Sequence, residues 1–532
     1  MALYLLIAAI IILICVLSNK VTSKLGIPML LAFIALGMFF GSDGVVKIHF
    51  ANYEFAEQIC SVALIFIMFY GGFGTKWSEA KPVAVKSILL STVGVILTAG
   101  LTGGFCYLVL HFDFLESLLI GSVISSTDAA SVFSILKSKK LNLKYNTASM
   151  LEVESGSNDP CSYMLTLIIL SIMSAKASAG AIAYMVFAQI VYGTLIGVAI
   201  ALAASYILRN FKFAIAGFDA AFVLAIAALA YAVPSLIGGN GYLSAYIVGV
   251  VLGNKQIKNK KSLVNFFDGL TGLMEMLIFF LLGLLAFPSQ LPSIILPAVA
   301  IALFLTFVAR PVAVMAILIP TKCKLNQELF VSWTGLRGAA SIVFAIMATI
   351  NEAYMKNDIF HIVFFIVLLS ITFQGTLISF VAKKLKMIDD NENVLKTFSD
   401  YSEEIPVEFV KLEINHDHPW TDKSLKDITL PPDTLLVLLM RNKERIIPKG
   451  NTIIHQGDVI VLSAPSYLGK TKINLIETKV TKENEWNGKP ISSIPYNPDS
   501  LIIMIKRDGK YIIPSGNNIL KEDDMLVIST ST

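Results

Sequence analysis

The sequence predicts an all-α polytopic membrane protein with about 13 transmembrane helices, followed by a small α+β tail. Of its 532 residues, 55% are hydrophobic and 15% are charged, and its mean hydropathy is +0.71. Soluble domains carry about 25% charged residues, so this composition excludes a soluble multidomain protein. The charges are unevenly placed: residues 1–386 hold 25 Lys and Arg and 16 Asp and Glu, whereas residues 387–532 hold 17 and 22. The basic excess lies in short loops rather than on one face, which argues against a nucleic-acid partner.

Apolar segments of about the twenty residues that a helix needs to cross a bilayer recur with short breaks. The predicted spans are 2–18, 25–41, 54–73, 84–110, 116–136, 147–174, 180–207, 217–236, 241–254, 264–287, 292–319, 327–350 and 358–382. The first has no basic region before it and no small-residue cleavage site after it, so we interpret it as a span and not as a removable signal.

Loop charges test this count, because cytoplasmic loops carry the Lys and Arg excess and alternate with external ones. The loops after the odd-numbered spans hold 20 Lys and Arg in total, and the other side holds only Lys47, Lys176 and Lys356. The sequence therefore predicts an external N-terminus and a cytoplasmic tail, in the plasma membrane.

Several charges lie at membrane depth, where each costs about 2.5 to 3.5 kcal/mol on insertion scales. They are Asp128, Glu152, Glu154, Asp159, Glu275, Arg310 and Arg337, with Asp219 and Asp268 nearer to span ends. Such charges are expected either to pair with one another or to mark a transport pathway.

Two spans contain polar or glycine-rich blocks that favour a break in the helix. These blocks are residues 125–131 in the fifth span and 333–341 in the twelfth. If the seventh span is a linker, the two interrupted spans occupy corresponding places in two inverted halves. That arrangement indicates a transporter with its site at the midplane. The alternative is two unrelated helices with small-residue packing patches.

The sixth span supplies oxygen ligands beside these breaks. Pro160 has no backbone N–H to donate to the carbonyl of Gly156, so that carbonyl is left as a free acceptor one turn before Asp159. Asp159, Asn158, Ser155 and Thr127 are hard oxygen ligands that suit a small cation. A carboxylate that holds either a cation or a proton, but not both, is sufficient for antiport.

These motifs resemble the cation:proton antiporter superfamily, and within it the NhaP-like potassium(sodium)/proton antiporters. The resemblance covers about residues 1–386. It is carried by Ser126-Thr127-Asp128, the Glu154-Ser155 to Asn158-Asp159-Pro160 run, Arg310-Pro311, Gly335-Leu336-Arg337-Gly338-Ala339, and the glycine-rich segment 238–243 before the short ninth span. It implies an NhaA-like fold with inverted repeats.

The resemblance also implies roles for individual residues. Asp159 would bind the cation and the proton alternately, with Thr127, Ser155 and Asn158 lining the site. Asp128 would cap the broken helix ends, and Glu154 would form a structural ion pair with Arg337. The Asn-Asp pair implies electroneutral exchange, and a homodimer is expected. Ala129 stands where many members have Pro, a variant that favours K⁺ over Na⁺.

Other buried charges keep two readings. Arg310 either pairs with Asp128 or satisfies carbonyls near Phe307. Glu275 and Asp268 either line an access pathway or make hydrogen bonds between helices. Glu152 is left unassigned, and Asp219, near a span end, is expected to be structural.

The tail is an internal repeat with a period of 66 residues. Residues 415–464 match residues 481–530 at 16 of 50 positions without a gap, including Trp420 with Trp486 and Arg441 with Arg507. We expect a transmembrane domain over 1–386, a linker over 387–402 and two modules over 403–466 and 467–532. Each module should contain a strand, a short helix (424–428 and 490–494), a buried strand (435–440 and 501–505) and a final strand (459–463 and 525–529).

The repeat resembles the TrkA-C (RCK C-terminal) regulatory module. This resemblance implies a small-molecule ligand that controls transport; nucleotides are among the ligands of that family, but the sequence identifies none. Such modules also occur on channels, so a ligand-gated cation channel or a transport-dead sensor is the alternative function.

Other motifs in the sequence do not support a different function. Gly469-Lys470-Thr471 lacks the first glycine of a phosphate loop, and His416-Asp417-His418 lacks further metal ligands nearby. The five cysteines show no metal spacing. No arrangement of nucleophile and base appears, so neither an enzyme nor a resident cofactor is expected.

Overall fold

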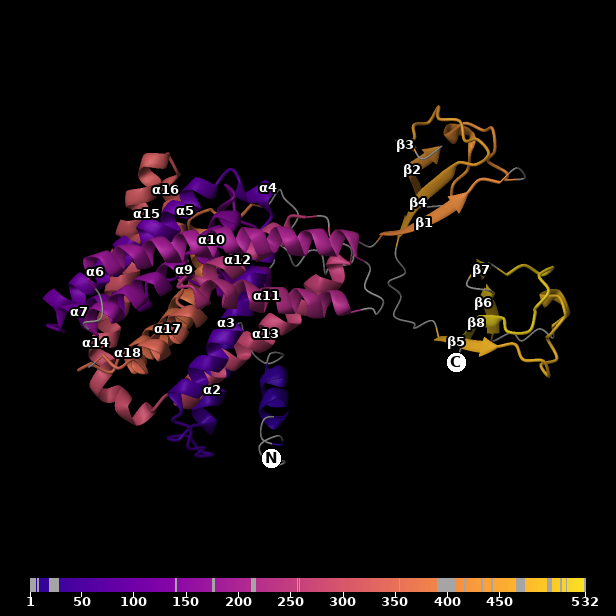
Figure 1. The fold of residues 1–532 in the computed structure, drawn as a ribbon. Helices are drawn as coiled ribbons and strands as arrows, with labels where there is room; N and C mark the ends of the chain where they lie inside the picture. Colours follow the sequence, from indigo (N-terminus) through magenta and orange to yellow (C-terminus); the bar gives the residue numbers. More distant parts are fainter. Residues whose placement is uncertain are drawn as a thin grey trace. The chain divides into compact units, whose positions relative to one another are not determined.

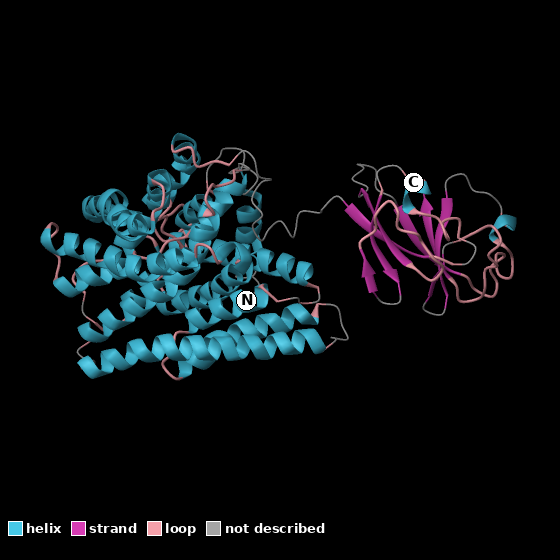
Figure 2. Ribbon diagram, turned by 90° about the horizontal axis from the view of Figure 1, so that it is seen from above, coloured by secondary structure: helices cyan, strands magenta, loops and turns pink. Residues whose placement is uncertain are grey.

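The fold is described from a computed structural model, which describes residues 6, 9–18, 28–138, 141–174, 178–211, 217–255, 257, 259–353, 355–389, 407–415, 418–431, 434–441, 444–465, 474–494, 500–507, 510–512 and 514–530. The chain divides into two compact units, residues 1–403 and 404–532. The long helices belong to the first unit and the named strands to the second (Figure 2). Residues 416–417 of the His-Asp-His motif and residues 469–471 of the Gly-Lys-Thr motif lie outside the described residues.

The first unit is a bundle of helices that follows the predicted spans (Figure 1). Its helices are α2 (Met29–Phe40), α3 (Tyr53–Gly74), α4 (Trp77–Ala80), α5 (Ala84–Leu89), α6 (Val95–Leu108), α7 (Phe114–Val123), α8 (Ala129–Ser138), α9 (Thr147–Met173), α10 (Ala179–Asn210), α11 (Phe218–Leu236), α12 (Gly241–Gly253), α13 (Lys260–Leu285), α14 (Leu291–Phe304), α15 (Arg310–Leu318), α16 (Leu325–Trp333), α17 (Ala339–Thr349), α18 (Ile359–Leu369) and α19 (Thr376–Lys384). A further apolar helix covers Ala9–Ser18. Among the described residues, seven helices are long and apolar enough to cross a membrane.

The two predicted breaks are confirmed. The fifth span consists of α7 and α8 with five non-helical residues, 124–128, between them, and the twelfth consists of α16 and α17 separated by residues 334–338. Short polar side chains compete with the backbone for hydrogen bonds in the first break, and two glycines weaken the helix in the second. Each half-helix therefore ends inside the protein.

Three further spans contain π-helical segments that the sequence did not predict. They are η1 (Leu90–Gly94) between α5 and α6, η3 (Leu305–Ala309) between α14 and α15, and η5 (Ser370–Gly375) between α18 and α19. The first two occupy the fourth and eleventh spans, which correspond under the predicted inverted repeat. Segments of this kind occur frequently at functional sites.

Two pairs of helices pack with almost no space between their backbones. A side chain at Gly72 of α3 would meet the carbonyl oxygen of Tyr246 in α12, and one at Gly249 would meet that of Phe69. Gly37 of α2 and Gly283 of α13 make the same kind of reciprocal approach. Under the inverted repeat, α3 corresponds to α13 and α12 corresponds to α2. The same close glycine packing therefore occurs once in each of the two related helix pairs.

The second unit contains two four-stranded antiparallel sheets. They are built from β1 (Val407–Glu413), β2 (Leu435–Arg441), β3 (Glu444–Ile446) and β4 (Val459–Pro465), and from β5 (Asn474–Lys479), β6 (Ser500–Arg507), β7 (Lys510–Ile512) and β8 (Met525–Thr530). The strand orders are β1-β4-β2-β3 and β5-β8-β6-β7. The predicted short helices are single 3-10 turns, Leu425–Asp427 and Ile491–Ser493.

The two modules also share an irregularity and an ion pair. The register shifts between Leu436 and Leu438 in one sheet, and between Ile502 and Met504, 66 residues later, in the other. The predicted duplication is therefore confirmed at the level of strand register. Arg441 Nη2 lies 2.7 Å from the buried Asp458 carboxylate, and in the second module Arg507 Nη2 lies 2.6 Å from the buried Asp524 carboxylate.

Burial alone would raise the pKa of Asp458, but the hydrogen bonds from the Arg441 side chain and the His455 backbone N–H outweigh it and lower the pKa. A lowered pKa in the folded state means that the pair stabilises the module fully above the ordinary Asp pKa of about 3.9. The stabilisation begins to decline as the pH falls below that value, and it is lost as the pH falls through the lower pKa of the folded state.

We predict that hydrogen-exchange protection of β4 in the full-length protein falls as the pH drops from about 5 to below 4. Asp458→Asn should lower protection at neutral pH and remove this pH dependence. Asp422→Asn is the control, because the Asp422 side chain is 76% exposed and its exchange should follow wild type. An unchanged pH dependence in Asp458→Asn would contradict the assignment.

A second prediction concerns the close helix contact at Gly72. Gly72→Ala should lower the free energy of unfolding by about 1 to 3 kcal/mol, because the added methyl group meets a backbone carbonyl. Gly71→Ala is the matched control, since nothing lies within 4 Å of a methyl group there. Thermal melting in detergent measures both; equal losses would show that the contact is not the cause.

Candidate ion-binding site

The two broken helices are joined to each other at their breaks. The backbone N–H of Asp128 donates to the carbonyl of Leu336 at 2.8 Å. The Asp128 carboxylate accepts from Ser131 N at 3.2 Å and from Ser131 Oγ at 2.5 Å, which places it as a cap at the N-terminus of α8. A side chain at Gly338 would occupy the position of this carboxylate, so glycine is required at that point of the second break.

Arg337 satisfies the other end of the first break. Its Nη1 donates to the carbonyls of Ser125 and Ser126 at 2.8 and 2.5 Å, just beyond the C-terminus of α7. Its side chain is buried, and its backbone N–H donates to Ser370 Oγ. A guanidinium here stabilises the negative end of the half-helix dipole. It also donates hydrogen bonds to carbonyls that have no partner within a helix.

Helix α9 attaches to the same break through three polar side chains. Asn158 Nδ2 donates to Thr127 Oγ1 at 2.5 Å, and Ser155 Oγ donates to the Thr127 carbonyl at 2.8 Å. Ser126 Oγ donates to Asp159 Oδ1 at 2.6 Å. The Asp159 carboxylate is thereby held beside the place where the two broken helices meet.

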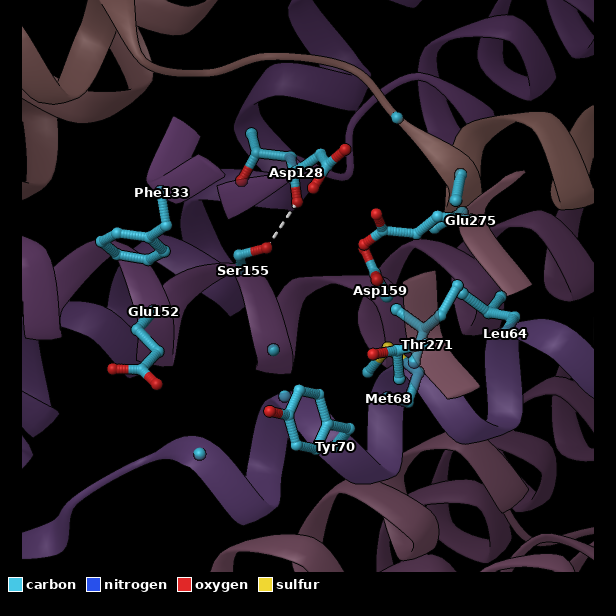
Figure 3. Close-up of a pocket in the computed structure, with 18 of the residues that line it drawn as sticks. Leu64, Met68, Tyr70, Asp128, Phe133, Glu152, Ser155, Asp159, Thr271 and Glu275 are labelled. Atoms are coloured by element: carbon cyan, nitrogen blue, oxygen red, sulfur yellow. Dashed lines mark hydrogen bonds between the residues drawn. The ribbon is translucent and has the colours of Figure 1, made fainter. Parts of the chain in front are cut away.

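Asp159 lies in a cavity of about 450 Å³ between α3, α9, α13 and the two breaks (Figure 3). Five carboxylates line it: Asp128, Glu152, Asp159, Asp268 and Glu275. Figure 3 shows the Glu275 side chain directed toward Asp159. No lining residue among those that the structure describes is basic. A cavity with this charge attracts cations and excludes anions.

The cavity contains most, but not all, of the residues expected to line an ion site. Asp159, Thr127, Ser155, Asp128 and Glu275 line it. Asn158 does not line the cavity. It is fully buried, and its side chain donates a hydrogen bond to Thr127 in the first break.

The sequence reasoning missed Ser126 and Glu152. Ser126 immediately precedes the expected ligand Thr127, and its hydroxyl bonds Asp159. Glu152 lies seven residues before Asp159, which is two helical turns on the same face of α9, and this spacing was the available signal. Asp268 lines the cavity and also accepts a hydrogen bond from Tyr70 Oη at 3.1 Å, so both of its proposed readings apply.

The expected ion pair between Glu154 and Arg337 is wrong. Glu154 Oε1 lies 2.5 Å from Arg310 Nη2, and both side chains are buried. Gly335 makes this possible, because a side chain there would lie 2.9 Å from Arg310 Nε. Arg310 was expected to pair with Asp128 or to satisfy carbonyls near Phe307, but its ion pair is with Glu154. Asp219 accepts a hydrogen bond from Ala220 N near the start of α11.

Two interrupted helices that are joined at their breaks, beside a buried acidic cavity, are the arrangement expected of a membrane carrier. A sequence profile described as "Sodium/hydrogen exchanger, transmembrane" matches residues 8–384, and the chain belongs to this family of cation/proton antiporters. A TrkA-C domain profile matches twice in the tail, over residues 409–466 and 475–532.

Its relatives extend over most of the chain. It is 33% identical to the K(+)/H(+) antiporter NhaP of Alkalimonas amylolytica over 464 residues, which cover 86% of this chain and 80% of the relative. It is 32% identical to the K(+)/H(+) antiporter NhaP2 of Shewanella sp. (strain ANA-3), with the same coverage. The solved structure of the sodium proton antiporter MjNhaP1 from Methanocaldococcus jannaschii at pH 8 is similar with a TM-score of 0.64 and 25% identity, covering 72% of this chain and 99% of that one.

The revised ion pair can be tested by a double-mutant cycle. Breaking a buried pair by removing one partner costs about 3 to 5 kcal/mol, because the other charge is left uncompensated. Glu154→Gln and Arg310→Gln should each lower thermal stability, and the double variant should recover much of the loss.

The matched control is a second double-mutant cycle in which Arg337, and not Arg310, is the partner of Glu154. Glu154→Gln combined with Arg337→Gln should show much weaker coupling, because Arg337 holds the carbonyls of Ser125 and Ser126. Thermal melting of the purified variants measures both cycles. Stronger coupling of Glu154 to Arg337 than to Arg310 would restore the original pairing.

Proposed function

We propose that this chain exchanges K⁺ for protons in an electroneutral, alternating-access cycle. One observation carries the proposal: the Asp159 carboxylate lies in an acidic cavity and accepts a hydrogen bond from a neutral hydroxyl, that of Ser126. A carboxylate in these surroundings is neutralised either by a cation or by a proton. Competition between the two for one carboxylate gives one-for-one exchange.

The residues around Asp159 are proposed to have two different roles: some bind the cation, and others neutralise structural charges. Thr127 and Ser155 line the cavity beside Asp159 and offer oxygen atoms to a partly dehydrated monovalent cation. The charges of Asp128 and Arg337 are already committed to the helix ends, and Glu154 is paired with Arg310. The charge that changes during the cycle is then that of Asp159.

The conformation is proposed to be open toward the cytoplasm. The cavity includes Gly74 at the end of α3, and Glu152 and Asp268 near the beginnings of α9 and α13. Each of these helix ends joins a lysine-rich loop, which the charge distribution assigns to the cytoplasm. We further propose a plasma-membrane homodimer with an external N-terminus, acting as a carrier and not as an enzyme.

K⁺ is proposed as the preferred cation over Na⁺. The relatives from Alkalimonas and Shewanella are named K(+)/H(+) antiporters. Ala129 after Thr127-Asp128 agrees with this choice, although the structure of MjNhaP1 is that of a sodium proton antiporter. The duplicated TrkA-C modules are proposed to adjust the exchange rate in response to a small-molecule ligand, for which a nucleotide is one candidate.

The proposal predicts that Asp159→Asn abolishes K⁺-dependent proton flux in proteoliposomes, because the amide carries no charge to exchange. Asp219→Asn is the control; it replaces a buried acid outside the cavity and should retain flux. The same assay with Na⁺ and Li⁺ ranks the cations. Flux that survives Asp159→Asn, or ion currents far above carrier turnover as expected of a channel, would contradict the proposal.

A further inference from the structure

A second cavity lies on the opposite side of α9 from the ion site. Its volume is about 400 Å³, within the range of small-molecule binding sites, about 300 to 1,000 Å³. Its walls come from α5 and η1, α9, α10 and α12. Positions 152, 155, 156 and 159 of α9 line the ion cavity, and positions 153, 157, 160, 161 and 164 line this one.

The second cavity offers an apolar surface. Most of its lining residues are Ile, Val, Leu, Met and other apolar side chains. Several of its polar side chains are already bonded to the protein: Thr92 Oγ1 donates to the Ile88 carbonyl, Ser157 Oγ to the Val153 carbonyl, and Asn240 Nδ2 to the Pro160 carbonyl and Gln189 Oε1. Apolar cavities of this kind do not hold water, so an apolar ligand is the suitable occupant.

The cavity borders the bilayer on one side. Ile88 of α5 and Ile190 of α10 both line it, and they are 49% and 48% exposed within predicted membrane spans. Exposed isoleucines at this depth face lipid. The source of an apolar occupant is therefore the surrounding membrane.

One end of the cavity lies beside basic residues. Thr75 and Trp77 line it at that end, and Lys76, which lies between them in the sequence, forms a partly exposed ion pair with Glu79 at 3.8 Å. Asn254 fixes this end by accepting from Trp77 N at 2.8 Å and donating to the Thr75 carbonyl at 2.8 Å, which brings the adjacent Lys255 to the same region. Lys255, together with the ion-paired Lys76, gives this membrane surface a basic excess, which favours an anionic headgroup.

We propose that this cavity binds one acyl chain of an anionic phospholipid from the leaflet on the side of Lys76 and Lys255. The chain contacts the back of the helix that carries Asp159. It lies against Tyr246, whose ring leaves no room for a side chain at Gly156, and this contact forms the wall between the two cavities. The proposal does not depend on which cation the ion site carries.

The test uses phosphatidylglycerol with a photoactivatable group on its acyl chain, added to the full-length protein in detergent and followed by peptide mass spectrometry. Cys161 and Tyr246 line the cavity and are only 8% and 7% exposed, so lipid on the outer surface cannot reach them. Adducts on these two residues are expected. Adducts confined to exposed residues such as Leu195 would overturn the proposal.

Matched variants separate the cavity from the outer surface. Thr194→Trp fills the cavity and should abolish the adducts on Cys161, whereas Leu195→Trp places the same side chain at a neighbouring position, 64% exposed, that does not line it. Thermal melting confirms that each variant is folded. Equal labelling of Cys161 in both variants would contradict the assigned cavity.

Headgroup selectivity is tested by repeating the labelling with phosphatidylcholine that carries the same acyl group. Wild type should label more strongly with phosphatidylglycerol. Lys76→Gln combined with Lys255→Gln should remove that preference, and Lys356→Gln, in a loop predicted to lie on the other membrane side, should retain it. Equal labelling of wild type by both lipids would overturn the anionic part of the proposal.

Discussion

The architecture of the site depends on how two interrupted helices satisfy their backbone groups inside a membrane. An unpaired carbonyl or N–H at this depth costs several kcal/mol. The first break uses the second to meet that requirement: Asp128 N donates to the Leu336 carbonyl, and Arg337 Nη1 donates to the carbonyls of Ser125 and Ser126. The breaks hold each other in place, and α9 is attached to the same point through Thr127.

This arrangement separates the structural charges from the charge of Asp159, which we propose to be the one that exchanges. Glu154 and Arg310 neutralise each other, Arg337 stabilises the end of α7, and Asp128 caps α8. Asp159 keeps a hydroxyl donor within an acidic cavity. This arrangement also requires two glycines. A side chain at Gly335 would collide with Arg310, and one at Gly338 would collide with Asp128.

The sequence could predict the spans, the breaks and the duplicated tail because each rests on a local pattern: apolar length, polar blocks and a 66-residue period. It could not predict which arginine pairs with Glu154, because Arg310 and Arg337 are both buried charges in the sequence. Only the three-dimensional positions of Gly335 and of the Ser125 and Ser126 carbonyls distinguish them. The π segments and the close approach of Gly72 to Tyr246 likewise depend on packing between distant helices. Asn158 was expected in the cavity, but it bonds the break instead.

The central claim is that one carboxylate, Asp159, holds either a cation or a proton. Proton release on K⁺ binding to the purified protein in weakly buffered solution tests it most directly, with bound K⁺ counted in the same sample. The account predicts one proton released for each K⁺ bound, and neither binding nor release in Asp159→Asn. Binding of K⁺ without proton release, or an unchanged release in Asp159→Asn, would contradict it.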